Sequence, residues 1–141
     1  GDKRYLLVAD TGNNGLAAAV HMLYLVEEPP VDPKRGVSVK QVPVAQLIHF
    51  SYEDDYRNCE AVAVDPTSKT FLLATKERPT GCYVYALPWP ENNPKKAFTA
   101  RRIATLELPG ATAMDVSPDG LRAVVLTYGN AYEYRRGAKG G

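Results

Sequence analysis

Short runs of apolar residues, many of them alternating with polar ones, follow one another along the chain and are separated by turns rich in proline and glycine. An alternation of period two is typical of β-strands, and no window carries a convincing apolar stripe of helical period. The alanine-rich segment Gly15–Leu25 comes closest to a helix. It follows the turn-forming Gly12–Gly15 and continues into the alternating HMLYLVE, so we predict a loop followed by a strand there, with a helix as the alternative.

The pattern predicts ten strands: Arg4–Asp10, Val20–Glu27, Val42–Ser51, Ala61–Asp65, Thr70–Thr75, Tyr83–Leu87, Thr99–Leu108, Ala113–Ser117, Arg122–Thr127 and Ala131–Tyr134. Asp65–Lys69 and Ser117–Gly120 each place a proline where a tight turn favours it. The longer proline-rich segments Pro29–Gly36 and Pro88–Lys96 are expected to be surface loops.

One phrase of the sequence recurs. Val64-Asp65-Pro66 and Val116-Ser117-Pro118 lie 52 residues apart, and the same spacing places FLLATK (Phe71–Lys76) on AVVLTY (Ala123–Tyr128). YLLVAD (Tyr5–Asp10) is a third copy of that second strand. Each copy is followed by a turn and an aromatic strand: HMLYLV, CYVYAL and AYEY.

A strand unit repeated at about 40–50 residues is typical of a β-propeller blade, which cannot bury both faces of its sheet without neighbours. We therefore predict an all-β fold, a single partial β-propeller domain over residues 1–141 with about 2.5–3 blades of antiparallel four-stranded meanders. The blades span roughly 4–52, 58–108 and 111–136 and hold three, four and three strands. Propellers close with about 4–8 blades. This chain is too short for such closure. We therefore expect an open partial propeller that is a fragment of a larger protein, or one closed by self-association through its open blade edges.

Composition excludes some partners. The 17 basic and 16 acidic residues leave a net charge of +1, which provides no electrostatic footprint for nucleic acid or an anionic membrane. The pairs Arg101-Arg102 and Arg135-Arg136 are interpreted as solvated strand positions and a tail. No apolar stretch reaches the roughly 18 residues of a membrane span. Neither nucleic acid nor membrane is expected as a partner.

The two cysteines are predicted to be free thiols. Cys59 opens one predicted strand and Cys82 the next but one. Strands two apart in a sheet lie about 9–10 Å apart, beyond the ~7 Å between Cα atoms that a disulfide tolerates. The sequence also lacks Cys/His metal spacing and the common catalytic motifs, so we name no catalytic residue.

The phrases VADTGNN, NCEAVAVDP, LLATK, CYVYALP and MDVSPDGLRAVVLTYGNAYEY resemble a family of bacterial propellers, described as NHL-like or esterase/phytase-like and mostly of unassigned function. The resemblance extends from Tyr5 to Tyr134. It implies an extracytoplasmic protein, secreted or periplasmic.

The resemblance also implies a cation site near one end of the propeller channel, where Asp10, Gly12, Asn14 and Glu60 match the family pattern. Two departures, Asn13 and Asn58, stand where that pattern usually has acids, and they weaken such a site.

The candidate metal ligands are Asp10, Asn14 and Glu60, and the cofactor they favour is Ca²⁺, which accepts carboxylate and amide oxygens. The other interpretation of DTGNN (Asp10–Asn14) is a turn closed by its own side chains. Glu60, at the head of an inner strand, either shares a cation or an acid–base role with a second carboxylate or bonds to backbone amides of a neighbouring blade.

Lys76 and Tyr128 end matching strands and are the candidate ligand-binding residues. Lys76 either binds an anionic ligand or is a solvated rim charge paired with Glu77 or Glu60. The acidic run Glu53–Asp55 is interpreted as a solvated loop, and the tyrosines as packing between blades with hydroxyls that reach water.

The leading functional hypothesis is a non-catalytic propeller module that binds an unidentified protein or small molecule. The rival is a divalent-metal-dependent hydrolase of phosphoesterase or lactonase type, in which Asp10, Asn14 and Glu60 hold the cation. A third hypothesis is an assembly module that works by adding strands edge to edge.

Overall fold

The computed structural model describes residues 3–30, 34, 41–77, 81–90 and 97–137, and within these ranges it contains ten strands and no helix. The strands are β1 (Tyr5–Asp10), β2 (His21–Glu27), β3 (Val44–Tyr52), β4 (Cys59–Asp65), β5 (Thr70–Thr75), β6 (Cys82–Pro88), β7 (Phe98–Leu106), β8 (Ala113–Val116), β9 (Arg122–Leu126) and β10 (Ala131–Arg135). The all-β class is confirmed, and each predicted strand is present with its ends shifted by two residues at most. Within Gly15–Leu25, residues 15–20 form a loop and His21–Leu25 belong to β2, as predicted. The two proline-rich loops lie largely outside the described residues.

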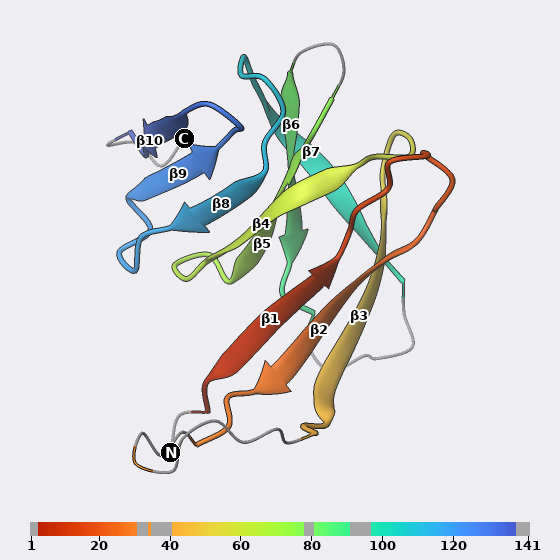
Figure 1. Cartoon of the computed structure of the whole chain (residues 1–141), viewed down its shortest axis with the longest axis vertical. Helices are drawn as coiled ribbons and strands as arrows, with labels where there is room; N and C mark the ends of the chain where they lie inside the picture. Colours follow the sequence, from red (N-terminus) through yellow and green to blue (C-terminus); the bar gives the residue numbers. More distant parts are fainter. Residues whose placement is uncertain (1–2, 31–33, 35–40, 78–80, 91–96, 138–141) are drawn as a thin grey trace.

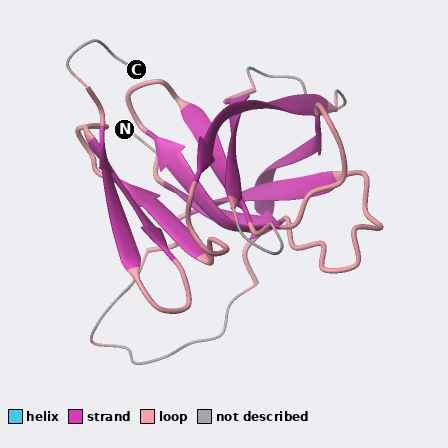
Figure 2. Ribbon diagram, turned by 90° about the horizontal axis from the view of Figure 1, so that it is seen from above, coloured by secondary structure: helices cyan, strands magenta, loops and turns pink. Residues whose placement is uncertain are grey.

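The strands form three consecutive meanders, β1–β3, β4–β7 and β8–β10 (Figures 1 and 2). The first two join in one seven-stranded sheet of order β1-β2-β3-β7-β6-β5-β4, and the third is a separate three-stranded sheet. Neighbouring strands within each meander are antiparallel. One pairing departs from the predicted antiparallel pattern, because β3 and β7 pair in parallel from Phe50–Phe98 to Tyr52–Ala100. Each is the last strand of its meander, and the pairing satisfies backbone groups that an edge strand leaves open.

The repeat in the sequence corresponds to a repeat in strand register. In the β4–β5 hairpin Val62 lies opposite Leu73, and in the β8–β9 hairpin Met114 lies opposite Val125. Both residues of the second pair lie 52 positions after those of the first. The recurring phrases therefore form the same hairpin twice.

The middle meander, β4–β7, is covered on both faces. Phe71, Leu73 and Tyr85 on one face pack in a cluster with residues of β2 and β3. Ala74 and Val84 on the other face pack in a second cluster with residues of the third meander. The first cluster includes the buried side chains of Leu23, Ile48, Phe50, Phe71, Leu73, Tyr85 and Leu87. The second includes those of Ala61, Ala74, Val84, Leu108 and Val125. Burial of a large apolar side chain contributes about 1.5–3 kcal/mol, so these two clusters hold the meanders together.

Both cysteines are buried and free, as predicted. Cys59 belongs to the first cluster and Cys82 to the second, on strands that flank β5. Burial raises the pKa of the Cys82 thiol to about 12, which keeps the thiol neutral at physiological pH.

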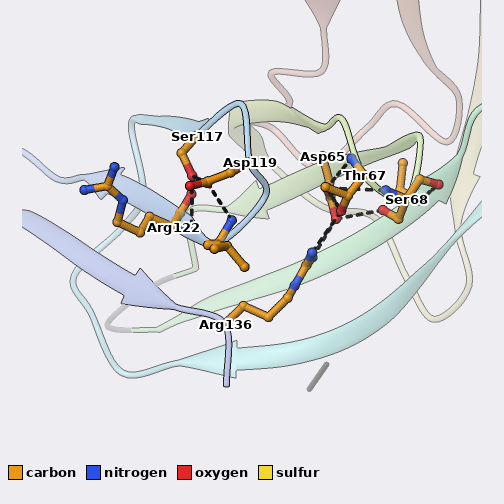
Figure 3. Close-up of polar contacts among 9 residues, drawn as sticks. Asp65, Thr67, Ser68, Ser117, Asp119, Arg122 and Arg136 are labelled. Carbon is orange, nitrogen blue, oxygen red and sulfur yellow. Dashed lines mark hydrogen bonds and ion pairs between the residues drawn. The ribbon is translucent and has the colours of Figure 1, made fainter. Parts of the chain in front are cut away.

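The equivalent turns Asp65–Lys69 and Ser117–Gly120 are each closed by a hydrogen bond between a carboxylate and a hydroxyl, and the two groups exchange positions between the turns (Figure 3). In the first turn the Asp65 carboxylate accepts hydrogen bonds from the Thr67 hydroxyl and backbone N–H. In the second, the Ser117 hydroxyl donates to the Asp119 carboxylate. The acid and the hydroxyl thus occupy opposite ends of the same turn, and either order satisfies the backbone.

Arg136 connects the third meander to the turn of the second. Its guanidinium donates to Asp65 Oδ2 at 2.6 Å and to Thr67 Oγ1 at 3.0 Å. Gly120 lies against the same turn with φ of +68°, and an added Cβ would stand 2.5 Å from Thr67 Cγ2. The interpretation of Arg136 as part of a solvated tail is wrong, because its guanidinium forms an ion pair with the buried carboxylate of Asp65.

We predict that Asp65 makes the fold sensitive to acid. Burial alone would raise the pKa of this carboxyl, but hydrogen bonds from Arg136, Thr67 and Ser68 outweigh burial and hold the pKa well below its ordinary value of 3.8. Because the pKa is lower in the folded state, the stabilisation is complete above about pH 4 and is lost as pH falls below it. Urea unfolding at several pH values should show Asp65→Asn less stable at neutral pH and with a flatter acid limb than the wild type.

Arg136→Met should cost about 1 kcal/mol at neutral pH, since this side chain is partly exposed and screened. Arg135→Met is the matched control, because Arg135 pairs with Glu133 at the surface and its loss should have little effect. An unchanged acid limb in Asp65→Asn would contradict the role given to this carboxylate.

Candidate functional site

The first strand of each meander contributes to one open cavity of about 420 Å³. The cavity is lined by Leu7, Ala9, Thr11, Gly12, Cys59, Glu60, Val62, Ala113 and Met114. Most of the lining residues have apolar side chains, and Glu60 is the charged one. Polar atoms form nearly as much of the exposed wall as apolar atoms do, so the cavity is mixed in character and has one carboxylate at its wall.

A β-bulge places Glu60 at this wall. Cys59 lies opposite Thr75 and Ala61 lies opposite Ala74, so Glu60 is an extra residue on β4 without a partner on β5. A bulge of this kind re-aims the side chain of the extra residue. The local register, and not the alternation of the strand alone, sets the direction of the Glu60 carboxylate.

Lys76 joins Glu60 to Tyr128. The Lys76 ammonium donates to the two Glu60 oxygens at 3.2 and 3.1 Å and to Tyr128 Oη at 2.7 Å. Its Nζ also lies 4.7 Å from the centroid of the Tyr128 ring. Hydrogen bonds to Tyr128 and to Glu60 raise the pKa of Lys76, so it stays protonated. Lys76 and Tyr128 end the equivalent strands β5 and β9, and they meet because those strands belong to adjacent copies of the hairpin.

Gly110 supports the stem of Lys76. Its φ is +50°, and an added Cβ would lie 3.0 Å from Lys76 Cγ. A larger residue at this position would press on the lysine side chain as well as strain the backbone. The lysine is thus held by packing along its stem and by hydrogen bonds at its end.

Asn58 extends the contacts to the β1–β2 loop. Its Nδ2 donates to Asn14 Oδ1 at 3.2 Å and to Glu60 Oε1 at 3.4 Å, while its Oδ1 accepts from the backbone N–H of Asn13 at 2.6 Å. We call Asn14, Asn58, Glu60, Lys76 and Tyr128 the polar cluster. An aspartate in place of Asn58 would repel Glu60 and lose both donated bonds, which explains the carboxamide at this position.

Asn13 also requires a carboxamide. Its Oδ1 accepts from the backbone N–H groups of Ala17 and Ala18, and its Nδ2 donates to the Ala18 carbonyl at 3.0 Å. Asn13 is buried. The two asparagines that depart from the acidic family pattern are thus used for donating hydrogen bonds, which carboxylates cannot do.

The structure brings together four of the five predicted site residues, Asn14, Glu60, Lys76 and Tyr128. The fifth, Asp10, ends β1 as an exposed residue outside the polar cluster, and its charge acts on His21. Over the part of the chain that is described, no group of three or more His, Cys, Asp or Glu residues is placed to hold a metal ion.

The sequence did not reveal the bridging role of Asn58 or a second hydrogen-bond network, which Asp54, Arg57 and Tyr85 form. The Tyr85 hydroxyl donates to both oxygens of Asp54, and Arg57 donates to the Tyr85 oxygen at 2.8 Å and pairs with Asp54 at 3.0 Å. Burial and the hydrogen bond to Asp54 raise the pKa of Tyr85. Glu53–Asp55 is an exposed loop, as predicted. Two of its acids also form specific contacts, Asp54 in this network and Glu53 with the backbone N–H of Arg102, which donates to its carboxylate.

No protein-family model matches the chain, and no curated protein matches it. Among solved structures, hydrazine synthase from Kuenenia stuttgartiensis is similar at 12% sequence identity with a TM-score of 0.46. The match covers 95% of this chain and 45% of that chain. A similarity at this level carries no argument about fold or function. None of the described segments forms a helix of the length and hydropathy needed to cross a bilayer.

We predict that Asn13→Asp destabilises the protein by about 1–3 kcal/mol, because it places a carboxylate at a buried position against the Ala18 carbonyl and removes the hydrogen bond which that carbonyl accepts. Asn14→Asp is the matched control, since Asn14 is exposed and uses its side-chain oxygen as an acceptor, which a carboxylate also provides. Urea unfolding of the two variants measures the difference. Equal stability of the two variants would show that the carboxamide of Asn13 has no structural role.

Proposed function

We propose that the three meanders are adjacent blades of a partial β-propeller of about 2.5–3 blades, and that the domain is a non-catalytic module that binds a peptide segment of a partner protein. The shared register of the β4–β5 and β8–β9 hairpins supports the blade assignment. The packing of β4 against β8 places equivalent first strands next to each other, as stacked repeats require.

The observation that carries the proposed activity is that Glu60 belongs both to the wall of the cavity and to the polar cluster. A ligand in the cavity meets apolar side chains such as Val62 and Met114, and next to them the donors and acceptors of the polar cluster. An extended peptide offers this combination, since its backbone carries both N–H and C=O groups and an apolar side chain can contact residues such as Val62 and Met114. The Lys76–Glu60 pair is neutral overall, which suits an uncharged backbone better than an anion.

Binding is favoured over metal-dependent hydrolysis by the state of Glu60. Both of its oxygens accept hydrogen bonds from Lys76, so a divalent cation at Glu60 would have to displace an ammonium group and would meet its repulsion. In the rival proposal Asp10, Asn14 and Glu60 hold Ca²⁺. The side chains of Asn14 and Glu60 are instead bridged by Asn58.

The test uses the two methionines as reporters. Met114 lines the cavity and Met22 lies on β2, which contributes no residue to the lining. N-acetyl-leucinamide, which carries an apolar side chain between two amides, should shift the methyl NMR signal of Met114 at millimolar concentration and leave that of Met22 in place. Lys76→Met should weaken this binding about tenfold, because Glu60 then turns toward solvent as an unpaired charge. Glu133→Gln, an exposed acid on β10, is the control and should leave binding unchanged.

The same samples test the rival. If Ca²⁺ shifts the Met114 signal and raises the melting temperature in a way that Glu60→Gln abolishes, the metal site is correct and the proposal is wrong. A cation bound at 100 times its dissociation constant would stabilise the fold by about 2.7 kcal/mol, which thermal melting detects. Absence of any shift with N-acetyl-leucinamide would also overturn the proposal.

A further inference from the structure

One side of β1 carries backbone groups without a strand partner. The Arg4 carbonyl accepts from the Glu28 N–H at 2.9 Å, which makes Arg4 and Glu28 a hydrogen-bonded pair of the β1–β2 ladder. Backbone groups alternate in direction along an antiparallel strand, so those of Leu6 and Val8 also face β2. Those of Tyr5, Leu7 and Ala9 face the opposite side, where no described strand pairs with β1.

The cavity lies along this free edge. Leu7, Ala9 and Thr11 belong to its lining, and Val62 of β4 and Met114 of β8 lie across it. At one end the edge is already used, because the Thr11 carbonyl accepts from the Cys59 N–H at 3.2 Å. The free N–H and C=O groups of Leu7 and Ala9 therefore border an open cavity that is closed at one end by β4.

The repeat shows what occupies this edge in the other two copies. β5 and β9 are the counterparts of β1, and each is paired on this side, with β4 and β8 respectively. In the sequence Leu7 aligns with Leu73 and Val125, which lie opposite Val62 and Met114. The backbone groups of those two residues face β6 and β10, so the hydrogen-bonding phase of β1 is shifted by one residue relative to the other two copies. The position next to β1 is nevertheless one where this sequence twice places an antiparallel strand.

We infer that an extended peptide strand of the β4 or β8 type, supplied by the partner protein, adds antiparallel to the free edge of β1. This inference rests on the proposed function, since it states how the peptide binds. A residue of the peptide forms a hydrogen-bonded pair with Leu7, as Ala63 does with Leu72 in the β4–β5 hairpin. Because the added strand is antiparallel to β1, its amino end lies beside Thr11 and Glu60. There Glu60 and Asn58 can exchange hydrogen bonds with its first residues.

A second copy of this chain is a poorer occupant. Pairing of β1 with β1 of another molecule would bring a whole three-strand meander to the edge. The space beside Leu7 and Ala9 is instead bounded by residues of β4 and β8. A single strand fits between these walls, and the Cys59–Thr11 hydrogen bond blocks continuation of a longer sheet edge.

The probe is a fluorescent synthetic peptide that copies Cys59–Asp65 with serine in place of the cysteine, Ac-SEAVAVD-NH₂, and its control is a scrambled peptide of the same composition. Anisotropy should show binding of the first peptide at least tenfold tighter than that of the second. Leu7→Pro removes the outward N–H of Leu7 and leaves the β1–β2 hydrogen bonds in place, so it should weaken binding at least tenfold. Leu7→Val keeps the N–H and should bind within about threefold of the wild type.

Amide hydrogen exchange of the wild-type chain keeps the inference testable if Leu7→Pro does not fold. The peptide should slow exchange at Leu7 and Ala9 and leave Leu6 and Val8 nearly unchanged, since the latter are already in the β1–β2 ladder. Binding without protection of Leu7 and Ala9 would overturn the inference. So would protection of these amides in the free chain together with dimerisation in light scattering, because a second copy would then be the occupant.

The outcomes separate this inference from the proposed function. If N-acetyl-leucinamide shifts the Met114 signal while the peptide gives no protection on β1, the cavity binds ligands and strand addition is wrong. If neither probe binds, both proposals are wrong.

Discussion

The middle meander has to be covered on both of its faces, and the arrangement of the other two follows from this requirement. Phe71 and Leu73 of β5 face one side, where the first meander packs, and Ala74 of the same strand faces the third meander. A four-stranded sheet that is apolar on both faces cannot be stable alone in water. The two contacts bring the first strands β1, β4 and β8 around one cavity, so the position of the site is a consequence of how the core is buried.

The contacts between the second and third meanders differ in kind from one end to the other. At one end the buried carboxylate of Asp65 is neutralised by the partly exposed Arg136. At the other end Lys76 and Tyr128 meet at the ends of equivalent strands. Apolar residues such as Val84 and Val125 fill the space between them. One interface thus combines a structural ion pair with a cluster that borders the cavity.

Equivalent positions of the repeat carry different chemistry. Asp10, Lys76 and Tyr128 end β1, β5 and β9 in the three copies of the hairpin. Two of them meet, since β5 and β9 lie in adjacent copies, while Asp10 lies apart. A repeated scaffold with varied residues at the strand ends is how a common fold acquires a particular site. The polar cluster is in this sense an addition to the repeat, and the Asn58 carboxamide fixes it to the β1–β2 loop through the Asn13 backbone N–H and the Asn14 side chain.

The strands, the repeat and the free thiols could all be predicted from the amino-acid sequence, because each depends on local alternation, turn chemistry or the fixed spacing between strands. The 52-residue spacing alone places Val62 and Met114 in equivalent hairpins, and the register confirms that equivalence. Which side chains meet depends instead on how the meanders pack. The partners of Arg136 and Asp54 and the role of Asn58 arise from contacts between residues far apart in the chain, and so does the parallel pairing of β3 with β7. Local pattern carries no information on such contacts. The direction of Glu60 depends on a bulge, which a strand's alternation cannot reveal because it is a departure from that alternation.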